Sequence, residues 1–198
     1  MAVADKYVIA RELATTLRSD KNIMAVALCG GRDKTWSSAD APSEMLIVVS
    51  RMPLDLDGFG RRVVKRQDFS FLLTHYTPQW LETSIEEEAG CWLVSGRVLY
   101  SKTLFDSGEN LLELRKAVHS ATKEKRMEAY KRWLAEARAF PAILLARGPS
   151  LTTASQRTLL RDDPALARVL FLLNGVPPSS EESLIDDMLR LERLPPGI

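Results

Sequence analysis

Two short apolar runs, joined by a polar loop that opens with two glycines, most constrain how this chain can fold. The first run covers residues 25–29 and ends at Gly30 and Gly31, and the second covers residues 45–49. Both runs have the length of a strand and are bounded by residues that favour turns. Paired glycines at the end of a strand let backbone N–H groups approach a ligand, usually an anion such as phosphate. The pattern therefore predicts two strands with an anion-binding turn after the first.

Composition limits the class of protein. The chain has 198 residues, enough for one ordinary domain or for a domain with a smaller appendage. Its 45% of hydrophobic and 27% of charged residues are typical of a globular protein. The net charge is only +1, so no overall field indicates nucleic acid as a partner. No apolar run approaches the roughly 18 residues that a membrane-spanning helix needs, so we expect no membrane partner.

The cysteines and the N-terminus bear on the compartment. Cys29 and Cys91 both stand in apolar runs, which is typical of reduced core residues rather than of a disulfide framework. Residues 1–20 carry charges throughout and lack the apolar segment of a signal peptide. We therefore expect a cytoplasmic protein.

Hydrophobic periodicity and turn residues predict the order of the elements. A first half is expected to contain a helix, strands and a second helix, and a second half is expected to be helical. Strands are predicted at 23–29, 44–49, 61–76 (two strands or one long bent strand) and 91–100, with a loop at 101–110. Helices are predicted at 5–18, 78–89, 109–139 (one long helix or a broken one), 163–174 and 180–192. This is an α+β protein, with an α/β domain at 1–106 and a helical domain at 107–198 packed on it.

The order of these features resembles the DNA polymerase beta-like nucleotidyltransferase superfamily, in its small bacterial and archaeal type. In that group a hydrophobic strand ends in Gly-Gly or Gly-Ser, and a loop then leads to an acid-apolar-acid strand. Here Glu44 occupies the first acidic position. The segment 69–78, with Thr77-Pro78 at its end, is similar to the third strand and the helix start. The run 96–103 is similar to a further strand, and residues 167–197 are similar to the helical tail. The resemblance implies a nucleotidyltransferase-like mixed sheet with flanking helices.

The resemblance also implies a reaction and the residues that would perform it. Two Mg²⁺ ions about 3.5–4 Å apart would clamp a triphosphate and activate the acceptor hydroxyl. Mg²⁺ selects oxygen ligands, mostly Asp or Glu, and acids two apart on a strand reach the same face. The second acidic position is Leu46 and the third is Ser70, neither of which supplies a carboxylate. Asp68 as a catalytic acid and Asp40 as a metal ligand are the substitutes that could assist Glu44.

A phosphate could still bind at the glycine turn without these acids. The candidates for phosphate or nucleotide binding are Gly30, Gly31, Arg32 and Ser43. A basic helix face at 115–132 is either a solvated face with i,i+4 pairs or a surface for an acidic partner, a nucleoside triphosphate or RNA.

Three hypotheses for function follow. The first is a nucleotidyltransferase-fold pseudoenzyme that binds a nucleotide or a protein partner. The second is an active, Mg²⁺-dependent enzyme that moves a nucleotidyl group from a nucleoside triphosphate to a small molecule, protein or RNA. The third is a structural or homo-oligomerisation module that binds no nucleotide. The spatial relation of the carboxylates of Glu44, Asp40 and Asp68 discriminates between the first two.

Overall fold

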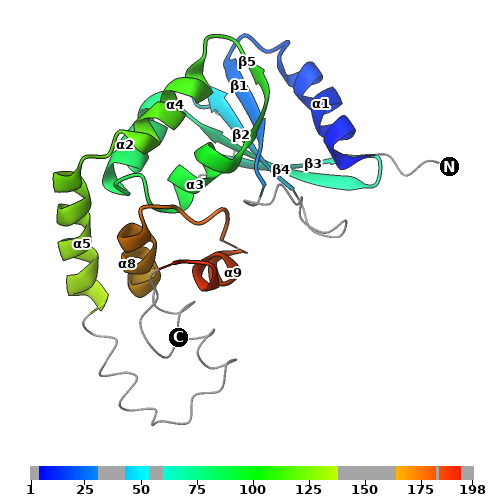
Figure 1. Ribbon diagram of the computed structural model, residues 1–198. Helices are drawn as coiled ribbons and strands as arrows, with labels where there is room; N and C mark the ends of the chain where they lie inside the picture. Colours follow the sequence, from blue (N-terminus) through cyan, green and yellow to red (C-terminus); the bar gives the residue numbers. More distant parts are fainter. Residues whose placement is uncertain (1–4, 31–42, 54–59, 138–163, 182, 193–198) are drawn as a thin grey trace.

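The computed structural model describes residues 5–30, 43–53, 60–137, 164–181 and 183–192 (Figure 1). Its strands are β1 (Ile23–Leu28), β2 (Ser43–Val49), β3 (Arg61–Arg66), β4 (Phe69–Tyr76) and β5 (Lys102–Asp106). Its helices are α1 (Lys6–Leu17), α2 (Pro78–Glu87), α3 (Leu93–Tyr100), α4 (Asn110–His119), α5 (Lys123–Ala137), α8 (Pro164–Asn174) and α9 (Leu184–Leu189). Among these described residues, no helix is long and apolar enough to cross a membrane.

The five strands form one mixed sheet in the order β3-β4-β2-β1-β5. β2 and β4 are parallel, and the other neighbouring pairs are antiparallel. β3 and β4 form a hairpin whose turn, Gln67–Asp68, has a left-handed residue at Gln67 (φ 51°). The region 61–76 is therefore two strands, one of the two forms that the sequence allowed.

Both faces of the central strands are buried, which explains why β1 is apolar along its whole length and β2 is apolar from Met45 onward. One face packs on α1, in a cluster that includes Ile9, Leu13 and Ile47. The other face packs on α2, α3 and α4, in a cluster that includes Leu46 and Val48. Figure 1 shows α1 on one side of the sheet and these three helices on the other.

The predictions for 91–110 were wrong. The run predicted as a strand at 91–100 is helix α3, and the predicted loop contains β5, an edge strand paired with β1. The carboxylate of Glu88 stabilises the start of α3: Oε1 accepts from the Val94 N–H (3.0 Å), and Oε2 accepts from the Ser95 N–H (2.8 Å). The likeness of 96–103 to a family strand fails for the same reason, because most of that run is helical.

The helical predictions hold with shorter boundaries. The predicted 109–139 helix is divided into α4 and α5, one of the two forms that the sequence allowed, and the predicted 180–192 helix is confined to α9. α4 contributes Leu111, Leu114 and Val118 to the sheet-facing cluster, whereas α5, α8 and α9 form a third cluster with residues from 89–92. The domain boundary at 106/107 stays a prediction.

Candidate functional site

Glu44 lies where β1 ends and β2 begins, beside the glycine turn. Its backbone carbonyl accepts a hydrogen bond from the Cys29 N–H (2.9 Å), so it sits next to the chain that leads into Gly30. Strand alternation places the Glu44 side chain on the face covered by α2, α3 and α4, together with Leu46. This end of the sheet is where the sequence predicts an anion site.

The carboxylate of Glu44 is already engaged by two partners. Oε1 accepts a hydrogen bond from the Thr74 hydroxyl of β4 (3.0 Å). Oε2 lies 3.0 Å from Nε of Arg97 on α3, and the two side chains are only 19% and 14% exposed. Nε does not meet hydrogen-bond geometry, so this contact is an ion pair without an aligned hydrogen bond. A cation from α3 therefore lies directly against the first acidic position.

The electrostatics of this cluster keep Arg97 charged. Burial by itself would lower the pKa of Arg97, but the negative charge of Glu44, with smaller effects from neighbouring groups, raises the pKa overall. Burial raises the pKa of Tyr76, and the positive charges of Arg97 and Arg61 oppose that rise. The guanidinium groups of Arg97 and Arg61 therefore both influence the pKa of Tyr76, and that of Arg97 also pairs with Glu44.

Leu46 is part of the core rather than of an open site. It is 1% exposed and stands opposite Ala27 of β1 and Thr74 of β4. Its cluster includes Leu111 and Leu114 of α4, so a helix from the second half of the chain closes over this face. The second acidic position of the implied site is thus filled by apolar packing.

The structure does not bring Asp68 or Ser70 beside Glu44. In the β2–β4 register, Leu72 is the residue opposite Glu44, and Asp68 is an exposed residue of the β3–β4 turn. Asp68 lies in the turn four positions before Leu72, and four positions of extended chain cover roughly 13 Å. Ser70 lies on the same face as Thr74 but closer to the turn, and Thr74 makes the contact with Glu44.

Of the remaining candidates for phosphate or metal binding, the structure describes only Ser43 and Gly30. Ser43 is buried at the start of β2, and Gly30 lies two residues after the end of β1. Gly31, Arg32 and Asp40 lie outside the described residues.

The described residues do not fit a two-metal centre. Within the described ranges no three His, Cys, Asp or Glu side chains gather in a way that could hold a metal ion. Glu44, the nearest match to the implied ligands, is bound to Thr74 and paired with Arg97. A divalent cation at Glu44 would have to displace a guanidinium that carries the same sign of charge.

Sequence reasoning missed Thr74 and Arg97. Thr74 could have been found, because β2 and β4 were both predicted strands and a parallel register places even-numbered residues of β4 on the Glu44 face. Arg97 gave no such signal, because its run was predicted to be a strand. The pairing depends on α3 crossing the sheet, which is a tertiary event.

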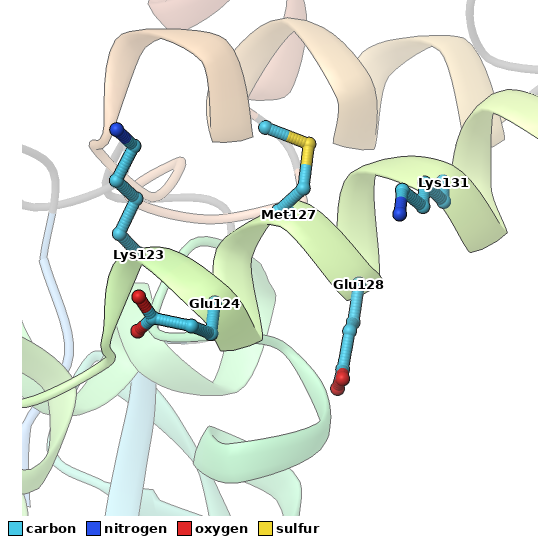
Figure 2. Close-up of a pocket in the computed structure, with 5 residues that line it drawn as sticks. All are labelled: Lys123, Glu124, Met127, Glu128 and Lys131. Atoms are coloured by element: carbon cyan, nitrogen blue, oxygen red, sulfur yellow. The ribbon is translucent and has the colours of Figure 1, made fainter.

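A shallow hollow along α5 tests the idea of a basic surface at 115–132. It has a volume of about 390 Å³ and is lined by Lys123, Glu124, Met127, Glu128 and Lys131. Figure 2 shows Lys123 and Met127 on one side of the helix and Glu124 and Glu128 on another. All five residues come from one helix and their charges balance, so this hollow resembles a solvated helix face more than an anion site.

Other basic residues of 115–132 have structural contacts. Arg115 donates to the Ser101 carbonyl (2.8 Å) and the Val98 carbonyl (3.2 Å) at the end of α3. Arg132 donates to the Glu87 carbonyl (2.6 Å), and Lys125 pairs with Glu86. These contacts join α4 and α5 to the preceding helices.

Comparison with known proteins supports the fold. No family model matches the chain, and no curated protein matches it. Among solved structures, the chain is similar to a nucleotidyltransferase-like protein from Exiguobacterium sibiricum 255-15, with a TM-score of 0.53 and 15% sequence identity. The match covers 95% of this chain and 63% of that protein, so the chain spans less than two thirds of the structure that it resembles. The chain therefore has a nucleotidyltransferase-like α+β fold, with a five-stranded mixed sheet and flanking helices.

Proposed function

We propose that this protein is a catalytically degenerate member of the DNA polymerase beta-like nucleotidyltransferase superfamily. In this proposal it binds a nucleoside triphosphate but does not transfer the nucleotidyl group to an acceptor. Magnesium is not needed for binding in this proposal. The single observation that carries it is the Arg97–Glu44 ion pair, because it places a fixed positive charge where the implied mechanism needs a metal.

The position of Leu46 supports the loss of catalysis. An active centre needs carboxylates that converge around an open cleft, whereas Leu46 is buried beneath the helices and Asp68 is distant along β4. Catalysis by Glu44 alone would lack the second ligand that holds two metal ions together.

Binding of the phosphates is supported by charge and by backbone geometry. Cys29, the residue before Gly30, donates its N–H to the Glu44 carbonyl just after β1, and Arg97 pairs with the Glu44 carboxylate. An arginine guanidinium recognises phosphate oxygens by paired N–H donors and does not require a metal bridge. A triphosphate could therefore compete with Glu44 for Arg97.

Calorimetric titration with ATP, in the presence and absence of Mg²⁺, tests the proposal. We expect binding of similar affinity in both conditions, and we expect Arg97→Met to weaken it by about tenfold, which is about 1.4 kcal/mol. Glu44→Ala removes the competing carboxylate and should leave binding intact or strengthen it. Lys21→Met is the control, because it removes a positive charge from an exposed position before β1, at the other end of that strand from Gly30.

The other hypotheses predict different results. Mg²⁺-dependent binding that is lost in Glu44→Ala would contradict the proposal and support the active enzyme. The absence of ATP binding in a folded protein would also contradict it and favour a protein-binding or oligomerisation module.

A further inference from the structure

A second cavity, far from the glycine turn in sequence, lies where α2, the start of α3, α5 and α8 meet. Its volume is about 480 Å³, within the range of about 300–1,000 Å³ that small-molecule sites occupy. The described residues that line it are Trp80, Ser84, Glu87, Glu88, Trp92, Val94, Arg132, Trp133, Glu136 and Arg168. Both halves of the chain contribute, and junctions of this kind are preferred places for ligands.

The cavity is rich in aromatic surface. It contains three of the chain's four tryptophans: Trp80, Trp92 and Trp133. Trp92 and Trp133 are buried, whereas Trp80 is 46% exposed. Trp80 stacks on Tyr76, with ring centroids 4.5 Å apart and an angle of 14° between the planes, so its ring is held in one orientation. A fixed, half-exposed indole is a surface on which a planar ligand can stack.

Arg168 supplies a positive charge between the other two indoles. Its Cζ lies 5.2 Å from the ring centre of Trp92 and 5.8 Å from that of Trp133. Its Nε is buried and has no hydrogen-bond partner. Its NH1 lies 3.9 Å from a carboxylate oxygen of Glu136, which is too far for a hydrogen bond. The Arg168 side chain is 32% exposed, so its guanidinium can be reached from the cavity. A guanidinium with a buried, unsatisfied donor indicates a missing acceptor, and the strongest acceptor is an anion.

The acidic residues of the cavity do not fill that role. Both oxygens of Glu88 accept hydrogen bonds at the start of α3, from the backbone of Val94 and Ser95. Glu87 and Glu136 are exposed, and an exposed ion pair at 3.9 Å is worth about 0–1 kcal/mol. A bound anion that makes aligned hydrogen bonds to Arg168 can therefore displace Glu136.

We infer that this cavity binds a small anion that carries a planar ring, with the ring against Trp80 and the anionic group on Arg168. Two kinds of molecule have this chemistry: an aromatic carboxylate and a nucleoside monophosphate. The site is distinct from Glu44 and does not depend on the function proposed above.

The test is titration of the full chain with benzoate, with adenosine monophosphate and with benzamide, a neutral molecule of the same shape as benzoate. Tryptophan fluorescence is the readout, because three indoles line the cavity, and calorimetry confirms the affinity. We expect benzoate or adenosine monophosphate to bind at least about tenfold more tightly than benzamide, since charge-assisted hydrogen bonds are about twice as strong as neutral ones. The anion that binds more tightly shows whether the natural ligand is an aromatic carboxylate or a nucleoside monophosphate.

Substitutions then locate the site. Arg168→Met should weaken binding of the anion by about tenfold or more, and Trp80→Ala should weaken it by several-fold through lost stacking. Glu136→Gln should strengthen it, because the competing carboxylate is removed. Lys131→Ala is the matched control: it removes one positive charge from α5 but does not line the cavity. Glu44→Ala should also have no effect.

Three results would overturn the inference. They are the failure of both anions to bind to the folded protein, binding of benzamide as tight as that of the tighter-binding anion, and anion binding in Arg168→Met that matches the unmodified chain. If Arg168→Met fails to fold by circular dichroism, the exposed positions Trp80 and Glu136 still decide the outcome. Unchanged affinity in both of those variants then contradicts the inference.

Discussion

At the scale of single residues, the chemistry of this protein depends on which side chains reach Glu44. Thr74 and Arg97 bind its two carboxylate oxygens, and Leu46 lies in the core two positions further along β2. Glu44 is therefore held in a structural ion pair, whereas Leu46 is part of the packing. An acid introduced at position 46 would place a charge among apolar side chains.

We predict that Leu46→Asp lowers the free energy of unfolding by about 3–5 kcal/mol, because an uncompensated charge would be buried. Urea denaturation measures the change. Val63→Asp is the matched control, since Val63 is 64% exposed in β3 and its replacement should cost about 1 kcal/mol or less. A Leu46→Asp protein as stable as the control, with Mg²⁺-dependent transfer activity, would show that packing does not block the site.

Glu88 gives a prediction about pH. Burial raises the pKa of Glu88, although hydrogen bonds from Ser95 and Val94 and the charge of Arg97 oppose part of the rise. The folded protein therefore holds this proton more tightly than the unfolded chain does. Glu88 contributes stability that is fully present below its unfolded pKa, near the ordinary 4.5, and is lost as pH rises through the folded pKa.

In Glu88→Gln this dependence should disappear. The difference in unfolding free energy, unmodified chain minus variant, should fall as pH rises from the ordinary pKa of 4.5 through the folded pKa, by about 1.4 kcal/mol for each unit of pKa shift. Urea denaturation of both proteins across this range provides the measurement. A difference that stays constant, or that increases with pH, would contradict the raised pKa.

At the scale of elements, α3 shows where local sequence is ambiguous. Its eight residues form a short apolar run, and a run of that length fits a strand or a buried helix equally well. Two contacts from outside α3 favour the helix: the Glu88 carboxylate caps its start, and Arg115 of α4 donates to carbonyls at its end. β5 then follows as an edge strand, because α3 returns the chain to the free side of β1.

Gly96 shows how closely α3 approaches the segment before α9. A Cβ added at Gly96 would lie 1.7 Å from the Pro178 carbonyl oxygen and 2.9 Å from its carbon, so the backbone would have to move. Alanine normally stabilises a helix interior by about 1 kcal/mol relative to glycine. At position 96 we expect the opposite effect, so that alanine lowers the stability of the protein relative to glycine.

We predict that Gly96→Ala destabilises the protein by about 1–3 kcal/mol, as overpacking does. Gly108→Ala is the control, because the added Cβ would meet only Asn110 Nδ2 at an ordinary 3.6 Å and should change stability by about 0.5 kcal/mol or less. Thermal denaturation of both variants provides the comparison. Equal stability of the two variants would mean that the contact with Pro178 is not maintained in solution.

At the scale of the whole molecule, two of the three buried clusters of the described residues contain side chains from both halves of the chain. α4 packs on the sheet together with α2 and α3, while residues 89–92 pack with α5 and α8. The helices after residue 106 are therefore joined to the sheet through α4 and through the turn between α2 and α3.

We predict that Leu111→Ala destabilises the whole chain by about 2–5 kcal/mol, the cost of a cavity in a core. Leu111 is fully buried in the sheet-facing cluster, and its neighbour Leu112, which is 44% exposed, provides the control variant Leu112→Ala. Circular dichroism and tryptophan fluorescence should shift together, because Trp92 and Trp133 belong to the cluster with α5 and α8. A shift in only one of the two signals would show that the halves unfold independently.

The sequence by itself determined α1, β1, β2, α2, α8 and the acidic residue beside the glycine turn. Those elements have strong local periodicity or a local cap, such as Thr77 before Pro78, and local patterns can be read without knowledge of neighbours. The mixed sheet and its likeness to a nucleotidyltransferase fold follow from the order of such elements.

Only the tertiary structure decided that 93–100 is a helix, that 102–106 is an edge strand, and that Arg97 lies against Glu44. It also assembled the cavity around Arg168 from four separate helices. The physical reason is common to all of these features. The residues that stabilise them are far apart in the chain, and their interaction energies exist only after the sheet and helices have packed together.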